Sequence, residues 1–258
     1  MKRYMLTMGG SEYGWSRHND EGVHRDYDAE ASRLLDSAKN WGIECIKLDN
    51  DYIKNWKHYN ENKDILQKPG FGFTFKAIGF CEVLKIMDDG DVALFVDSNH
   101  LVAKDPQMFY DFAEKNSIFV QDHIWLHFPN KDFTKRDTFV NMGCDEERYW
   151  NSLQMQCSIM GVCKNDFGVS FFKEYLEYCL NPKIMFGENK HPNFPTFRES
   201  RHNQSIFSIM VEKYKLPYIK RGKDTIWVEH IIPEIDFITP KTIVDNSYRK
   251  EEDEKYIR

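Results

Sequence analysis

The sequence predicts an α/β fold in a single domain, with a mixed, mostly parallel sheet flanked by helices. Three observations support this prediction. Residues 4–8, 26–41 and 44–48 read as strand, helix and strand. The apolar run Val92–Val96 reads as a strand buried on both faces, as the central strands of such sheets are. A length of 258 residues with 41% hydrophobic residues is sufficient for one sizeable core.

The elements follow in order from hydrophobic periodicity and from glycine and proline breakers. The first helix has a spaced apolar stripe, and Gly42 ends it. Residues 51–68 have no clear period, so we expect a loop with short helical pieces there. Residues 181–200 carry three prolines and read as a long loop. We expect further helices at 73–87, 106–115, 138–142, 146–153, 169–179 and 202–214, and further strands at 100–103, 118–121 and 155–163.

The chain shows no repeat, linker or low-complexity segment. We therefore expect one domain over residues 1–247, followed by a charged, solvated tail over residues 248–258. The first apolar run is too short for a signal peptide, and no stretch reaches the length of a transmembrane helix. These absences predict a cytoplasmic protein without a transmembrane segment.

Composition narrows the classes of partner. A net charge of −6 argues against a nucleic-acid-binding surface, which usually carries a basic excess. The six cysteines form no Cys-x-x-Cys pair, which argues against zinc and favours reduced, buried thiols. Aromatic residues reach 15% of the chain. They either fill the core or, at a few positions, stack on a sugar or a base.

The segment Gly90–Asn99 carries the clearest chemical pattern. Its apolar strand ends in Asp97, with Asn99 two residues later. A carboxylate at the end of such a strand lies where open α/β sheets bind ligands. Asp-x-Asn offers hard oxygen ligands that suit Mg²⁺ or Mn²⁺ held against a diphosphate. The alternative is an ordinary turn after a strand, for which Asp, Ser and Asn are common residues.

The first strand runs into Gly9 and Gly10. Because glycine has no Cβ, a ligand can approach the backbone closely at such a place. The pattern lacks the spacing of a dinucleotide-binding motif, so it is a weak indication of a ligand site.

Four segments between Pro69 and Met210 together resemble the bacterial and viral glycosyltransferases of GT-A-like fold. The resemblance covers about half of the chain. The segments are Gly-Phe-Gly-Phe-Thr-Phe-Lys-Ala at 70–77, the run from Asp89 to Asn99, Thr-Lys-Arg-Asp at 134–137 and Arg-His-Asn-Gln-Ser-Ile at 201–206. The chain departs from the group where Asn203 replaces Asp and where Asn99 ends the Asp-x-Asp pattern.

The resemblance implies a hexosyltransferase-like enzyme that uses a nucleoside diphosphate sugar, a glycan or other hydroxyl acceptor, and Mn²⁺ or Mg²⁺. Polysaccharide biosynthesis is the corresponding process. We expect metal ligands at Asp97, Asn99 and His230, the last beside Glu229. We expect donor-binding residues at Thr7, Gly9, Lys76, Asp97 and Arg136, with Lys135 as a further phosphate partner, and catalytic residues at Gln204, Asn203 and Asp137.

An inverting reaction needs a base for the acceptor hydroxyl. Asp122, His123 and Asp137 are candidates, and each is weak on sequence alone. His123 and His127 are four residues apart, as in a helical metal pair, but Pro129 and the aromatic surroundings favour loop histidines. The alternative for His230 is an ordinary surface histidine.

Two other classes of function stay open. The amides at Asn99 and Asn203 bring no charge to a divalent ion, which favours a non-catalytic nucleotide-sugar or glycan-binding protein. A phosphoryl or nucleotidyl transferase would also use a carboxylate and a metal, although the chain has no P-loop. For each lysine and arginine above, the alternative is a solvated surface charge.

Overall fold

The computed structural model describes residues 1–9, 27–49, 51–52, 55–66, 74–102, 105–122 and 128–219. Its strands are β1 (Arg3–Met8), β2 (Glu44–Leu48), β3 (Val92–Val96), β4 (Ile118–Phe119) and β5 (Ile159–Cys163). Its longer helices are α1 (Tyr27–Lys39), α5 (Phe75–Ile86), α6 (Gln107–Asn116), α10 (Asp166–Leu180) and α12 (Asn203–Lys213). Its shorter helices are α3 (Lys57–Glu61), α4 (Lys63–Leu66), α7 (Asn130–Phe133), α8 (Arg136–Asn141), α9 (Glu147–Trp150) and α11 (Pro182–Met185).

The described strands form one sheet in the order β2-β1-β3-β5-β4. β1 pairs in parallel with both β2 and β3, whereas β5 is antiparallel to β3 and to β4. The predicted α/β class with a mixed, mostly parallel sheet is therefore confirmed. Val92–Val96 is the middle strand, and all five of its residues are buried, as the continuous apolar run predicts.

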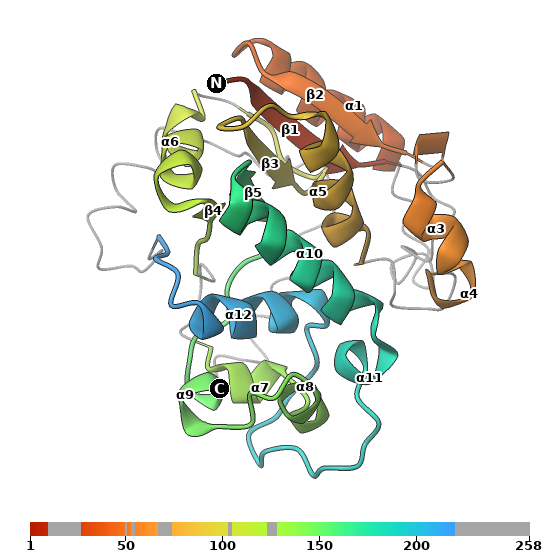
Figure 1. Ribbon diagram of the computed structural model, residues 1–258, viewed down its shortest axis with the longest axis vertical. Helices are drawn as coiled ribbons and strands as arrows, with labels where there is room; N and C mark the ends of the chain where they lie inside the picture. The colour runs from red at the N-terminus through yellow and green to blue at the C-terminus, as the bar shows by residue number, and fades with distance from the viewer. Residues whose placement is uncertain are drawn as a thin grey trace, which may run out of the picture.

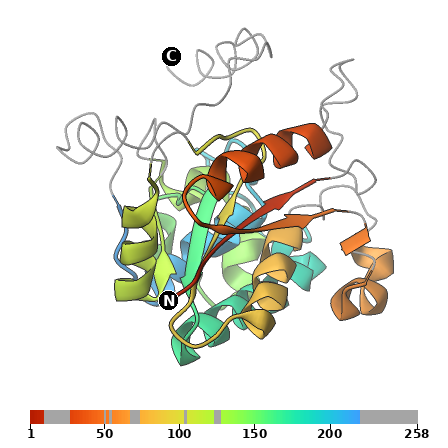
Figure 2. The same ribbon diagram turned by 90° about the horizontal axis from the view of Figure 1, so that it is seen from above.

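Helices cover both faces of the sheet, and the alternation of side chains along the strands divides the core accordingly. Met5, Leu94 and Val96 face the cluster that includes residues of α1 and α6. Leu6 and Phe95 face the larger cluster, which includes residues of α5, α10 and α12. Figure 2 shows the resulting layers, with α1 on one side of the strands and α5 on the other.

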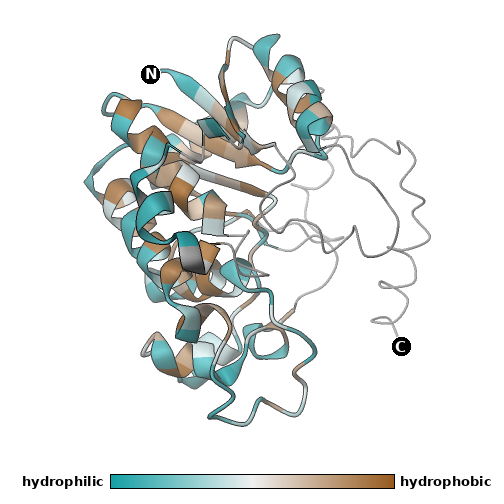
Figure 3. Cartoon of the chain, turned by 90° about the vertical axis from the view of Figure 1, so that its right-hand side faces the viewer, coloured by the Kyte–Doolittle hydropathy of each residue, from teal (hydrophilic) through white to brown (hydrophobic). Residues whose placement is uncertain are grey.

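The short helices α7, α8, α9 and α11 gather beyond α12, at the end of the molecule away from α1 (Figure 1). α10 packs against α5, α11 and α12 and so joins this helical group to the sheet layers. Hydrophobic residues lie on the strands and on the inward helix faces, and hydrophilic residues lie outside (Figure 3). Among the described helices, none combines the length and apolar character that a membrane crossing requires.

Three predicted strands differ from the structure. The strand predicted over 118–121 ends at Phe119. Residues 100–102 belong to no strand, and the strand predicted over 155–163 begins only at Ile159. The apolar residues Met155 and Cys157 are buried as the sequence suggests, at 3% exposure each. They lie outside the named strands, although Met155 forms an isolated antiparallel bridge with Asp122. The end of the predicted domain at residue 247 and the tail from 248 lie outside the described residues.

Candidate active site

Asp97, directly after β3, forms an ion pair with Lys76 from the first turn of α5. The Nζ atom of Lys76 lies 2.6 Å from Oδ1 of Asp97 and 2.8 Å from the main-chain oxygen of Cys157. It also lies 4.9 Å from the ring centroid of Phe95. Lys76 is only 8% exposed, whereas the Asp97 side chain is 37% exposed. A buried positive charge thus supports a carboxylate whose second oxygen remains available to a ligand.

Two buried oxygen atoms belong to residues near this carboxylate: Asn99 is two residues along the chain, and Ser158 bonds to the Asp97 main chain. Oδ1 of Asn99 and Oγ of Ser158 are buried and have no hydrogen-bond partner in the described part of the chain. The main-chain oxygen of Ser158 accepts a 2.8 Å hydrogen bond from the Asp97 amide. Buried polar atoms without a partner are rare, and they commonly indicate a bound water, ion or ligand. The carboxyl end of β3 is therefore the candidate site.

The end of β1 lies beside the same edge. Oγ1 of Thr7 donates a 2.6 Å hydrogen bond to the main-chain oxygen of Val96, and Thr7 is fully buried. Its hydroxyl therefore joins the two strands and does not reach outward. At Gly9, an added Cβ would lie 2.6 Å from Oδ1 of Asp28 and 3.2 Å from Cδ of Lys47. The close approach at Gly9 is thus made by the protein's own side chains.

Residues 154–158, here called the crossing segment, connect this edge to α12. At the end of the segment nearest β5, the ammonium of Lys76 donates to the main-chain oxygen of Cys157. The main-chain amide of Asp97 donates to the main-chain oxygen of Ser158. Farther back, the Gln156 amide donates to the oxygen of Gln121 over 2.9 Å, two residues beyond the end of β4.

At the other end of the crossing segment, Met155 and Gln154 contact α12. The Met155 amide lies 2.8 Å from Oγ of Ser208. Oε1 of Gln154 accepts a 3.1 Å hydrogen bond from Nε2 of Gln204. Four residues span at most about 14 Å, which sets an upper limit on the distance between the two ends of the crossing segment.

Asn203 and Gln204 begin α12, but their environments differ. Nδ2 of Asn203 donates to the Tyr175 hydroxyl over 3.2 Å, and Asn203 is 3% exposed. Gln204 is half-buried, and its Oε1 has no hydrogen-bond partner among the residues that the structure describes. The helix follows His202, and no side chain of the described residues caps it. Gln204 is thus the member of the pair that presents a free polar atom.

Arg136 lies in α8 and is engaged by neighbours within the helical group. Its guanidinium pairs with Asp145 at 3.2 Å and lies 5.3 Å and 5.1 Å from the ring centroids of Trp150 and Phe194. Nζ of Lys135 lies 3.3 Å from Oδ1 of Asn189. No described contact joins either cation to the Lys76–Asp97 pair.

Asp137 binds the loop that follows α11. Its carboxylate accepts hydrogen bonds from the amides of Glu188, Lys190 and His191 and contacts Nδ1 of His191 at 2.8 Å. Burial alone raises the pKa of this carboxyl, but the hydrogen bonds from His191, Lys190 and Glu188 outweigh it and lower the pKa to about 2. The side chain is 3% exposed, so this arrangement holds the loop in place.

The remaining predicted residues are buried or lie outside the described part. Asp122 is 2% exposed, and its amide donates to the oxygen of Ile219. Four histidine or glutamate positions and part of one motif lie outside the described residues: His123, His127, Glu229, His230 and residues 70–73. Within the described part, no group of three or more metal-ligating side chains occurs.

The sequence did not indicate Gln154, Asn130 and Ser158 as site residues. Gln154 and Asn130 are 1% and 0% exposed, and Nε2 of Gln154 lies 2.7 Å from Oδ1 of Asn130. A glutamine within an apolar, sulfur-rich stretch was the available indication, because a buried amide requires partners.

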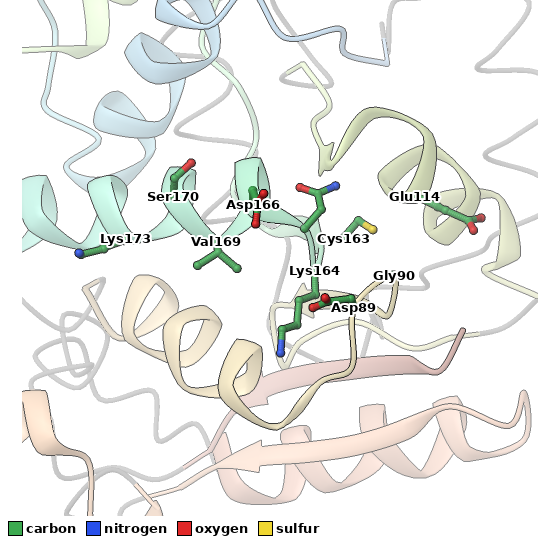
Figure 4. A pocket seen from close by; sticks show the side chains of 10 residues that line it. Asp89, Gly90, Glu114, Cys163, Lys164, Asp166, Val169, Ser170 and Lys173 are labelled. Atoms are coloured by element: carbon green, nitrogen blue, oxygen red, sulfur yellow. The ribbon is translucent and has the colours of Figure 1, made fainter.

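A hollow of about 770 Å³ lies at the opposite, amino edge of β3 (Figure 4). It adjoins Gly90, Cys163 and Lys164, at the start of α10. The ammonium of Lys164 is bound to the oxygen of Met87 at 2.6 Å, and Asn165 caps α10. The hollow is large enough for a ligand, but it holds none of the unpartnered buried atoms found at the carboxyl edge.

No protein-family model matches the sequence, and no curated protein matches it. Among solved structures, the chain is similar to mouse xyloside xylosyltransferase 1 in its apo form, with 12% identity and a TM-score of 0.46 over 90% of this chain and 91% of that one. It is also similar to a glycosyltransferase involved in glycosylation of the major capsid of PBCV-1, with 13% identity and a TM-score of 0.39 over 90% of both chains. Likeness at this level gives no argument for a function, which must rest on the chain's own residues.

Proposed function

We propose that the chain is a glycosyltransferase that moves a sugar from a nucleoside diphosphate sugar to an acceptor hydroxyl. The observation that carries the proposal is the crossing segment, which ties the Lys76–Asp97 pair and the Gln204 amide to one edge of the sheet. Ligands of open α/β sheets bind outside this edge. A carboxylate with a buried cation at one end and a neutral amide at the other suits a charged nucleotide joined to a neutral sugar.

The reaction breaks the bond between the sugar's anomeric carbon and the diphosphate oxygen, and it forms a bond from that carbon to the acceptor oxygen. Negative charge develops on the departing diphosphate, so positive charge nearby stabilises the transition state. In the proposal, Asp97 accepts from a ribose hydroxyl or holds a cation, Lys76 fixes Asp97 and adds positive charge, and Gln204 contacts the sugar. The acceptor proton leaves to a base or to the departing diphosphate.

We assign no base role to Asp137. Its carboxylate is occupied by loop amides, and a group with a pKa of about 2 is a weak base at neutral pH. A sugar contact of Asn203 and phosphate contacts of Arg136 stay predictions, because both side chains are engaged within the protein.

Mn²⁺ or Mg²⁺ fits this edge of the sheet as an ion bound by both the protein and the donor diphosphate. Asp97 and Asn99 supply hard oxygens, and the buried Asn99 Oδ1 lacks a partner among the described residues. Such ions usually bind one or two protein oxygens, with phosphates and waters completing the shell. When bound, the ion would offset charge on the diphosphate. We propose Asp97 and Asn99 as its ligands.

A second candidate is a nucleotide-sugar-binding protein without turnover. The specific observation that favours it is the engagement of Asp137 by loop amides, which leaves no described carboxylate assigned as the base. The amides at Asn99 and Asn203 point in the same direction, since they carry no charge.

The two candidates separate in one experiment. The chain is incubated with a panel of nucleoside diphosphate sugars and Mn²⁺, while free nucleoside diphosphate and calorimetric binding are measured. Transfer or donor hydrolysis that Gln204→Ala lowers, with binding kept, supports the enzyme. Binding without turnover supports the second candidate, and the absence of both contradicts the whole proposal. Lys173→Ala, in the hollow at the amino edge, is the control and should match the unaltered chain.

A further inference from the structure

A chain of side-chain hydrogen bonds leads from α9 to Gln204. Oγ of Ser152 donates to the main-chain oxygen of Tyr149 over 2.9 Å. Nδ2 of Asn130 then donates to Ser152 Oγ over 2.8 Å, and Nε2 of Gln154 donates to Asn130 Oδ1 over 2.7 Å. Nε2 of Gln204 completes the chain by donating to Gln154 Oε1 over 3.1 Å.

Ser152, the first residue of this hydrogen-bond series, fixes the direction of every bond in it. A main-chain carbonyl can only accept, so the single hydroxyl proton of Ser152 is spent on Tyr149. Ser152 therefore accepts from Asn130, and Asn130 must turn its NH₂ group to Ser152 and its oxygen to Gln154. The same logic turns the oxygen of Gln154 toward Gln204. Each amide is thus oriented by the one before it.

Burial prevents the amide groups of Asn130 and Gln154 from reversing. Asn130 is 0% and Gln154 is 1% exposed, so a reversed amide would face an acceptor with an acceptor, without water to compensate. Oγ1 of Thr134 accepts from Gln154 as well, over 3.1 Å, which further binds the NH₂ group of Gln154 on the inner side. Gln204 is the half-buried end of the series, and its Oε1 is the atom that is left without a described partner.

We propose that Ser152, Asn130 and Gln154 are positioning residues that turn the carbonyl oxygen of Gln204 toward the donor sugar. This inference rests on the proposed function and adds the polarity of the contact. Gln204 then accepts a hydrogen bond from a sugar hydroxyl, or stabilises positive charge at the anomeric carbon, and does not donate. With Gln204 free to turn, its NH₂ group, which cannot accept, would face the sugar and the transition-state contact would be lost.

Substitutions that keep or remove the acceptor at position 130 test the orientation of the Gln204 amide separately from stability. In Asn130→Asp the carboxylate can only accept from Gln154, so the orientation of Gln204 is kept, although a charge is buried. In Asn130→Leu that acceptor is lost. The remaining partner, the Thr134 hydroxyl, can donate as well as accept, so Gln154 can reverse. The second pair, Gln154→Glu and Gln154→Leu, applies the same logic one step closer to Gln204 if a variant at position 130 does not fold.

Turnover at saturating donor, donor affinity and thermal midpoint are measured for all four variants. We expect the two leucine variants to lose turnover by about tenfold with donor affinity unchanged, as for one lost hydrogen bond in the transition state. The two carboxylate variants should stay within about threefold of the unaltered chain, although their midpoints fall at least as far. Turnover that follows the thermal midpoint across the four variants, or that does not change in any of them, overturns the proposal.

A measurement without substrate separates this inference from the proposed function. Hydrogen exchange of the Gln204 side-chain NH₂ group, followed by NMR, should be slow in the unaltered chain and in Asn130→Asp and fast in Asn130→Leu. If the unaltered chain turns over no donor, the proposed function fails, while slow exchange in this pattern still supports the fixed orientation. Equal exchange in all three overturns the orientation whatever the activity.

Discussion

At the scale of single residues, the Lys76–Asp97 pair has unequal partners. The lysine is 8% exposed, whereas the Asp97 side chain is 37% exposed. Water can therefore solvate the carboxylate but not the ammonium. Whichever group remains after a substitution determines the cost, because an isolated buried charge is strongly unfavourable.

We expect Asp97→Ala to destabilise the fold more than Lys76→Met does. The first leaves a buried ammonium whose remaining hydrogen-bond partner among the described residues is the Cys157 oxygen, at a cost of about 3 kcal/mol. The second leaves a half-exposed carboxylate and keeps most of the aliphatic volume. Denaturant unfolding of both variants and of the double variant measures this, and the double variant should recover stability relative to Asp97→Ala. If the two single variants lost the same free energy of unfolding, and the double variant lost the sum of the two, the pair would not be coupled.

Asp137 gives a pH-dependent prediction. Its pKa of about 2 lies below the value near 3.9 of an unfolded aspartate. Its contribution to stability, about 2 kcal/mol, is therefore present above about pH 5 and is lost as the pH falls toward 2.

Asp137→Asn should thus cost about this amount at pH 7 and little near pH 2, as followed by denaturant midpoints across the range. Asp88→Asn is the control, since the Asp88 side chain is 80% exposed and should change stability little at either pH. A cost of Asp137→Asn that is independent of pH would show that the loop amides do not hold a charged group.

At the scale of elements, the local pattern predicted most helices and the central strand. The run Val92–Val96 is apolar throughout, so its sequence and its place agree. Residues 155–158 of the crossing segment were predicted as strand because Met155 and Cys157 are apolar, and both are buried in the structure. Its backbone instead binds Ser208, Gln121 and Lys76, which only the tertiary fold brings near.

The candidate site was also predictable only where a local pattern in the sequence identifies the residue. Position in the chain identified Asp97, because a carboxylate directly after a buried strand reaches the edge of the sheet. The sequence also indicated Lys76 but not its pairing with Asp97. The partners of Arg136, namely Asp145, Trp150 and Phe194, come from separate segments, and no local pattern relates them.

Two glycines with the same nominal crowding should respond differently to alanine. At Gly161 in β5 an added Cβ would lie 2.5 Å from Leu94 Cδ2 and 2.8 Å from Cβ of Phe119, and the latter cannot rotate away. At Gly79 in α5 the close atom, also at 2.5 Å, is the tip of Leu48. We expect Gly161→Ala to cost about 1–3 kcal/mol.

Gly79→Ala should be near neutral, since alanine is about 1 kcal/mol more favourable than glycine within a helix and so offsets a rotation of Leu48. The thermal midpoints of the two variants, measured side by side, check this contrast. A larger loss for Gly79→Ala would mean that the contact between α5 and β2 is less adaptable than the one inside the sheet.

At the scale of the whole molecule, the candidate site joins the two parts that α10 packs together. Asp97 directly follows β3 of the sheet, and Gln204 belongs to α12 on the side of the short helices (Figure 1). A ligand that contacts both is bound only when the parts are assembled. Its binding energy therefore adds to the stability of the whole fold and not to that of one element.

The last prediction follows from this linkage. A nucleoside diphosphate sugar at 100 times its dissociation constant should stabilise the fold by about 2.7 kcal/mol, which raises the thermal midpoint by roughly 5–10 °C for a chain of this size. Differential scanning fluorimetry with and without the donor and Mn²⁺ measures the shift. Asp97→Asn, which keeps an oxygen partner for Lys76, should reduce the shift through weaker binding, whereas Lys173→Ala at the amino-edge hollow should keep it. The reverse result, with the shift lost in Lys173→Ala and kept in Asp97→Asn, would place the ligand at the hollow and would refute the site proposed at the carboxyl edge.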